Sequence, residues 1–84
     1  MQLLEKVAFR KVEARLAAWL LSRAEDDVVE ATQQDIARAI GSAREVVSRR
    51  LDALARRGWL ENGRGRVTIR DADALRRIAD EPAL

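Results

Sequence analysis

The sequence of 84 residues contains no cysteine, no histidine and no tyrosine, and aromatic residues make up only 4% of it. Without cysteine and histidine, the common zinc ligand sets, thiol nucleophiles and Ser–His or Cys–His dyads are excluded. A chain of this length buries only about 60 to 65% of the surface that its unfolded form exposes, which leaves little room for an enclosed substrate cavity. We therefore predict one small domain over residues 1–84 that is not an enzyme and that needs no metal and no cofactor.

Long apolar runs are also missing. The longest stretch without a charged residue covers residues 16–22, far short of the roughly 20 residues that a membrane-spanning helix requires. The first residues do not form a basic and then apolar secretion signal. We expect a soluble cytoplasmic protein without a membrane partner, associated with the nucleoid.

Positive charge is concentrated in the middle of the chain, although the formal net charge is only +2. Residues 32–60 carry six arginines against three acidic residues, and residues 61–70 carry three arginines against one. The segments on either side, 1–31 and 71–84, are net acidic. A basic middle between acidic ends indicates that one surface of the fold faces a polyanion.

Hydrophobic periodicity predicts the first three elements. Apolar residues recur at steps of three and four up to position 23, which predicts an N-terminal helix over residues 1–23. Val28 and Val29 suit a brief edge strand. Thr32 is typical of an N-cap, and it begins a two-turn helix whose inward residues are Ile36, Ala37 and Ile40. We expect that helix to end at Gly41, where the backbone must take a positive φ.

A second, longer helix follows Gly41, with Ser42 or Ala43 near its cap and Gly58 as its stop. Its inward residues are Val47, Leu51 and Leu54. Residues 63–65 are typical of a turn, and after it the apolar Val67 and Ile69 alternate with polar neighbours. This pattern predicts a β-hairpin over residues 59–70. Asp71 caps a final helix over residues 72–80, with an inward face of Ala72, Leu75, Ile78 and Ala79, and both Trp19 and Trp59 are assigned to the core.

This order of elements is typical of one architecture. A helix-turn-helix over residues 32–57 is followed by a wing over 59–70. The fold class that we predict is mostly α with a small β-hairpin wing, a winged helix-turn-helix with a three-helix core plus a C-terminal helix.

In the second helix of this helix-turn-helix, the polar face carries Arg44, Glu45 and Arg49. We predict that these residues read DNA bases. The major groove admits one α-helix, and the first residues of that helix reach the base edges. An Arg matches the two acceptors of guanine, and a Glu accepts from the amino group of cytosine. The alternative is a solvated helix face on which Glu45 and Arg49 pair at a spacing of four residues.

Contacts to the DNA backbone are predicted around this face. The N-terminal turn of a helix offers free N–H groups to an anion, and arginines on the flanks add affinity that depends on salt but not on sequence. The residues that we expect to contact the backbone are Thr32, Gln33, Gln34, Ser42, Ser48, Arg50, Arg64 and Arg66.

Residues 31–51, which read ATQQDIARAIGSAREVVSRRL, closely resemble the C-terminal DNA-binding domain of Crp/Fnr-type transcription regulators. The most specific part is the pattern Gly-x-x-Arg-Glu-x-x-x-Arg, and the resemblance covers about residues 7–79. It implies sequence-specific duplex DNA binding in which Arg44, Glu45 and Arg49 read bases. Ala43 and Val46 lack the hydroxyl groups often found at those family positions, and Arg50 is a candidate to replace them.

The resemblance also bears on partners. Regulators of this family carry an effector-binding β-barrel and a long dimerisation helix ahead of this domain, and neither fits before Val7, so we expect no small-molecule effector to bind this chain. Residues 1–6 fit either the tail of a dimerisation helix or the start of a stand-alone protein. The expected partners are double-stranded DNA, a second copy of the domain on that DNA, and RNA polymerase at the acidic loop 25–27. The alternative function is a winged-helix module that docks on RNA polymerase or a partner regulator.

Overall fold

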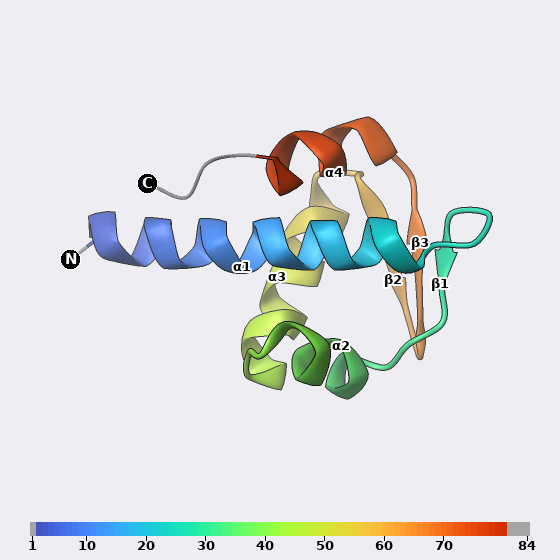
Figure 1. Ribbon diagram of the computed structural model, residues 1–84, viewed down its shortest axis with the longest axis horizontal. Coiled ribbons are helices and arrows are strands. Elements are labelled where there is room, and N and C mark those ends of the chain that lie inside the picture. Colours follow the sequence, from blue (N-terminus) through green and yellow to red (C-terminus); the bar gives the residue numbers. More distant parts are fainter. Residues whose placement is uncertain (1, 81–84) are drawn as a thin grey trace.

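The computed structural model describes residues 2–80, with side chains described from Arg10 onward. Four helices and three short strands follow one another in the order predicted (Figure 1). They are α1 (Gln2–Arg23), β1 (Val28–Val29), α2 (Gln33–Ile40), α3 (Arg44–Arg56), β2 (Leu60–Gly63), β3 (Arg66–Ile69) and α4 (Ala72–Ala79). The predicted fold class, mostly α with a small β-hairpin wing, is confirmed. Within the described residues, no helix combines the length and apolar character that crossing a membrane requires.

The helices pack around α1. In Figure 1, α1 lies across the molecule with α4 on one side of it and α2 on the other, and α3 crosses behind it. The predicted inward residues of α2 and α3 are all buried. The side chains that no solvent reaches come from α1, α2, α3 and α4: Leu16, Ala17, Leu20, Ile36, Val47, Leu51, Leu54, Ala74 and Leu75.

The predicted hairpin is part of a three-stranded antiparallel sheet in the order β1-β3-β2. Val28 pairs with Thr68 across one edge of β3, and Leu60 pairs with Ile69 across the other. Val67 and Ile69 are buried while their neighbours are not, which is the period-two pattern of a sheet with one face on the core. The edge strand at Val28–Val29 is confirmed, and it closes the base of the wing.

The turn between α2 and α3 is held by the backbone conformation of Gly41 and by a hydrogen bond from α1. Gly41 takes a left-handed conformation with φ 68°, as predicted. The Arg15 guanidinium of α1 donates a hydrogen bond to the carbonyl of Ile40, just before that glycine. The left-handed φ is what favours glycine at position 41, where a Cβ atom would also lie 3.3 Å from Nη2 of Arg15 and displace that group slightly. These contacts hold the helix-turn-helix against α1.

The residues expected on the inward face of α4 and the two tryptophans all pack against the core, but most of them are only partly buried. In α4, Ala74 is buried alongside Leu75, whereas Ala72, Ile78 and Ala79 are only partly buried. Trp19 and Trp59 lie at the edge of the core rather than inside it, and their rings are covered from outside by guanidinium groups, of Arg23 at 5.4 Å and of Arg57 at 5.1 Å from the ring centroids.

Candidate nucleic-acid interface

The exposed face of α3 carries the three residues predicted to read bases. Arg44, Glu45 and Arg49 are all exposed, whereas Val47 and Leu51 on the opposite side are fully buried. In the part of the chain that the structure describes, no ion pair joins Glu45 to Arg49. The solvated-face alternative thus lacks the pair that it invoked, and the three side chains lie together on the N-terminal half of the helix.

The first turn of α3 offers backbone donors that the sequence did not single out. The N-cap is Ala43, with extended backbone at φ −71° and ψ 144°, and it makes no side-chain cap hydrogen bond. Ser42 beside it is half-buried. Because the first N–H groups of a helix have no partner within the helix, those of α3 are available to an anion such as a phosphate. The sequence signal for this feature is Ala43, a poor capping residue directly before the helix.

At the N-terminus of α2, part of the predicted donor set is used within the protein. The Thr32 backbone N–H donates to Oδ2 of Asp35 at 3.0 Å, and the Asp35 N–H donates to Oγ1 of Thr32 at 3.0 Å, which makes a complete capping box. Thr32 and Gln34 are exposed and Gln33 is half-buried. An anion at this helix end therefore meets the side-chain amides of the two glutamines, with the Thr32 hydroxyl and the Asp35 carboxylate close by.

This capping box makes the domain less stable in acid. The hydrogen bond from the Thr32 backbone lowers the pKa of the Asp35 carboxyl, and the Thr32 hydroxyl and the charge of Arg38 lower it further. A carboxyl group whose pKa is lower in the folded than in the unfolded protein stabilises the fold at pH values above its unfolded-state pKa. This stabilisation is lost as the pH falls through the folded-state pKa. We expect wild type to exceed Asp35→Asn in free energy of unfolding at pH 6, with the difference shrinking below about pH 4. Urea unfolding at pH 6 and pH 3 measures it, and a difference that does not change with pH would contradict this assignment.

The wing carries two exposed arginines, Arg64 and Arg66, and Arg66 forms an ion pair with Glu30. Arg64 is exposed in the β2–β3 turn. Arg66 pairs with Glu30 at 2.9 Å, and the side chains of Arg66 and Glu30 are 60% and 68% exposed. Such exposed pairs contribute little to stability, so Arg66 can exchange Glu30 for a phosphate at small cost. The Ala31 N–H donates to the Gly65 carbonyl at 3.2 Å, which ties the wing turn to the segment before α2.

Arg50 has a partner that the sequence did not predict. It was expected to contact the DNA backbone, but its side chain is only 22% exposed and its Nη1 donates to Oε2 of Glu13 on α1 at 3.2 Å. On a helix, one residue turns the side chain by about 100°, so Arg50 points toward α1 while Arg49 points to solvent. Ser48, the other residue predicted on this flank, is half-buried. In the unbound domain, Arg50 therefore belongs to the packing between α1 and α3.

The acidic loop after α1 is a tight two-residue turn. Asp26 and Asp27 both have positive φ, 52° and 66°. Glu25 and Val28 exchange two backbone hydrogen bonds across them, of 2.9 and 3.0 Å, which is the pattern of a primed hairpin turn. The three acidic residues are exposed, and the turn lies well away from the N-terminal end of α3 (Figure 1).

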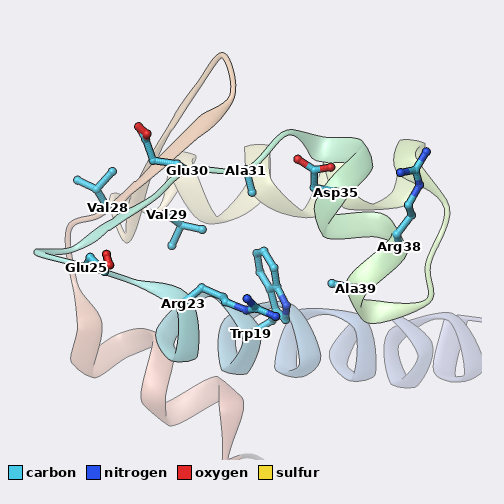
Figure 2. A pocket seen from close by; sticks show the side chains of 10 residues that line it. All are labelled: Trp19, Arg23, Glu25, Val28, Val29, Glu30, Ala31, Asp35, Arg38 and Ala39. Carbon is cyan, nitrogen blue, oxygen red and sulfur yellow. The ribbon is translucent and has the colours of Figure 1, made fainter.

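A groove that the sequence did not predict lies between the end of α1, β1 and α2 (Figure 2). Trp19 projects into it, and Arg23 lies along the indole ring. Its remaining charged lining residues are Glu25, Glu30, Asp35 and Arg38. Because both signs of charge line it, the groove favours no single class of ligand.

Comparison with known proteins identifies relatives over almost the whole chain. Residues 14–78 match the Crp-like helix-turn-helix domain. The transcriptional regulator SdrP of Thermus thermophilus is 31% identical over 86 residues, which covers 92% of this chain and 43% of that protein. A crystal structure of a CRP/FNR-family transcriptional regulator from the same organism superposes with a TM-score of 0.79 at 31% identity, covering 93% of this chain and 45% of the other. The structure of the reduced CO-sensing protein from R. rubrum gives 0.87 at 30% identity, covering 94% and 41%. The chain therefore spans less than half the length of these relatives.

Proposed function

The chain belongs to the family of Crp-like helix-turn-helix domains, and from that premise we propose that it binds duplex DNA sequence-specifically, with α3 in the major groove, as the DNA-binding part of a Crp/Fnr-type transcription regulator. The observation that carries this proposal is the exposed face of Arg44, Glu45 and Arg49 on a helix whose other side is fully buried. The family also accounts for the predicted helix-turn-helix and wing.

The geometry of α3 supports base reading. Arg44 and Arg49 are five residues apart, or about 7.5 Å along the helix axis, so the two side chains can reach different base pairs. Each arginine offers two parallel donors to the N7 and O6 acceptors of a guanine, and Glu45 between them accepts from the amino group of a cytosine. The preferred sequence is therefore expected to contain G·C pairs.

Phosphate contacts on two sides hold α3 in the groove in this proposal. The N-terminus of α2 contributes Thr32, Gln33 and Gln34, the wing contributes Arg64 and Arg66, and Ser42 before α3 and Ser48 on α3 complete the set. Such contacts set the position of the protein on the duplex and supply salt-dependent affinity without reading sequence. The first-turn N–H groups of α3, left without a side-chain cap, add donors on the same surface.

A second copy of the domain extends the binding site. Two domains related by a two-fold axis would read half-sites about 34 to 36 Å apart on one face of the duplex. With DNA as its ligand, we expect the protein in the cytoplasm, associated with the nucleoid. Contact of the acidic turn with RNA polymerase stays a prediction, and relatives described as transcriptional regulators do not favour a role in protein docking alone.

The experiment that tests this function is the selection of bound duplexes from a randomised DNA library by the wild-type chain, at low and at moderate salt. We expect a short motif containing G·C pairs to be enriched. A palindromic motif would indicate two copies on the DNA, and a single half-site would indicate one. Binding that is sensitive to salt but enriches no motif, or no binding at all, would contradict sequence-specific recognition.

A further inference from the structure

Glu13 is the one charged residue that is buried among the side chains from Arg10 to Asp80, with 8% of its surface exposed. Its carboxylate lies between two arginines of the α3 region. Oε2 accepts a hydrogen bond from Nη1 of Arg50 at 3.2 Å, and Oε1 lies 3.9 Å from Nη1 of Arg57, the C-cap residue. A single carboxylate of α1 thus engages both of these arginines.

The two arginines mark the flank of α3 that faces α1. They are seven residues apart, close to two helical turns, so they lie on the same side of the helix. Arg49, on the exposed face, is the immediate neighbour of Arg50 in sequence. A helix in the major groove has phosphates along both of its flanks, so an unengaged arginine at position 50 would lie next to a DNA strand.

Stability alone is a poor reason for this arrangement. Removing a carboxylate and a guanidinium from water is costly, and replacing a buried ion pair by apolar residues of similar volume is often neutral or stabilising. The neighbouring positions of α1 and α3, Leu16, Ala17, Val47 and Leu51, are apolar and fully buried, so an apolar pair would fit the surroundings. What the ion pair does provide is a fixed position for the positive charge of Arg50, on the flank of α3 that faces α1.

We propose that Glu13 is a specificity-determining residue that acts through Arg50: it keeps this arginine off the phosphate backbone and so limits the part of the affinity that is independent of sequence. The inference rests on the DNA-binding function proposed above. With Glu13 in place, Arg50 releases no counterions from the DNA, and discrimination depends on the base contacts of the exposed face. Without the carboxylate, Arg50 can extend to a phosphate, and the protein binds all duplexes more tightly.

The test measures how affinity depends on salt for a duplex that carries the selected motif and for one with the same bases shuffled. Four proteins are compared: wild type, Glu13→Gln, Arg50→Gln and the double variant. We expect Glu13→Gln to steepen the slope of log K against log[salt] by about 0.9, the value for one phosphate contact, and to raise affinity for the shuffled duplex about fivefold at 0.15 M salt. Arg50→Gln alone should keep the wild-type slope, and the double variant should return to it.

The matched control is Asp73→Asn, which removes the same charge from an exposed ion pair with Arg76 on α4. We expect it to leave the slope unchanged, because α4 lies on the side of α1 away from α2 (Figure 1).

A wild-type slope in Glu13→Gln, a lowered slope in Arg50→Gln, or a steep slope that persists in the double variant would each overturn the inference. Circular dichroism establishes that each variant is folded, and if Glu13→Gln is not, the Arg50→Gln comparison decides alone. A wild-type chain that binds no duplex contradicts the proposed function itself, whereas wild-type binding with any of the three outcomes contradicts only the role of Glu13.

Discussion

Arg44→Ala is expected to lower selectivity at one base pair of the recognised motif by about 1 to 3 kcal/mol, which is roughly 5-fold to 150-fold in relative affinity. Arg44 is exposed in the first turn of α3, where a helix in the major groove reaches base edges. Its loss removes two parallel donors from one guanine and leaves the other contacts in place. Sequences that lack that guanine should therefore lose little affinity. The measurement is competition binding with duplexes that carry each of the four bases at every motif position.

Arg64→Ala provides the matched control, because it also removes one exposed arginine but from the wing turn. Its loss should weaken binding to all sequences evenly and reduce the salt slope by about 0.9. Arg44→Lys separates charge from geometry: it retains the charge but not the planar fork of donors, so selectivity should still fall. Equal effects of Arg44→Ala and Arg64→Ala on every sequence would contradict base reading by α3.

The elements of the fold were predictable because local chemistry specifies their ends. Thr32 begins α2 through a hydrogen bond within its own first turn, and Gly41 ends it at a φ that other residues rarely adopt. Asp71 likewise caps α4 by accepting from the Ala74 N–H at 3.0 Å. Periodicity then identified the buried side of α2 and α3, which in turn identified the exposed face of α3. These signals all lie within a few residues of the feature that they predict.

The engagement of Arg50 and Arg66 was not predictable in this way. Their partners Glu13 and Glu30 are 37 and 36 residues away in sequence. A helix wheel shows which flank of α3 carries Arg50, but only the packing of α1 against α3 determines whether that flank meets solvent, a phosphate or a carboxylate. For the same reason, charge counting found the basic middle of the chain without showing how its arginines divide between DNA contact and structure.

The largest effect on stability is expected from Leu51→Ala. Leu51 is fully buried at the centre of α3, on the side opposite the base-reading face. Truncating a buried leucine costs about 2 to 5 kcal/mol, because transfer energy is lost and a cavity remains. Domains of this kind have a total stability of about 5 to 15 kcal/mol, and a loss of this size lowers the Tm of a small domain by roughly 10 °C or more. Thermal unfolding followed by circular dichroism measures it.

Two variants show whether the effect comes from the core. Leu51→Met keeps the volume and should cost less than about 1.5 kcal/mol, while Arg49→Ala, two positions away on the exposed face, should change stability by no more than about 0.5 kcal/mol. For the selectivity of DNA binding, the order of the two effects should be reversed. Arg49→Ala should lose selectivity at one base pair, whereas Leu51→Ala, measured well below its Tm, should keep the motif preference of wild type, because only the folded fraction binds and its recognition face is intact. A wild-type Tm in Leu51→Ala would mean that the buried stripe of α3 does not hold the helix in place, and the orientation of Arg44, Glu45 and Arg49 would then lose its physical basis.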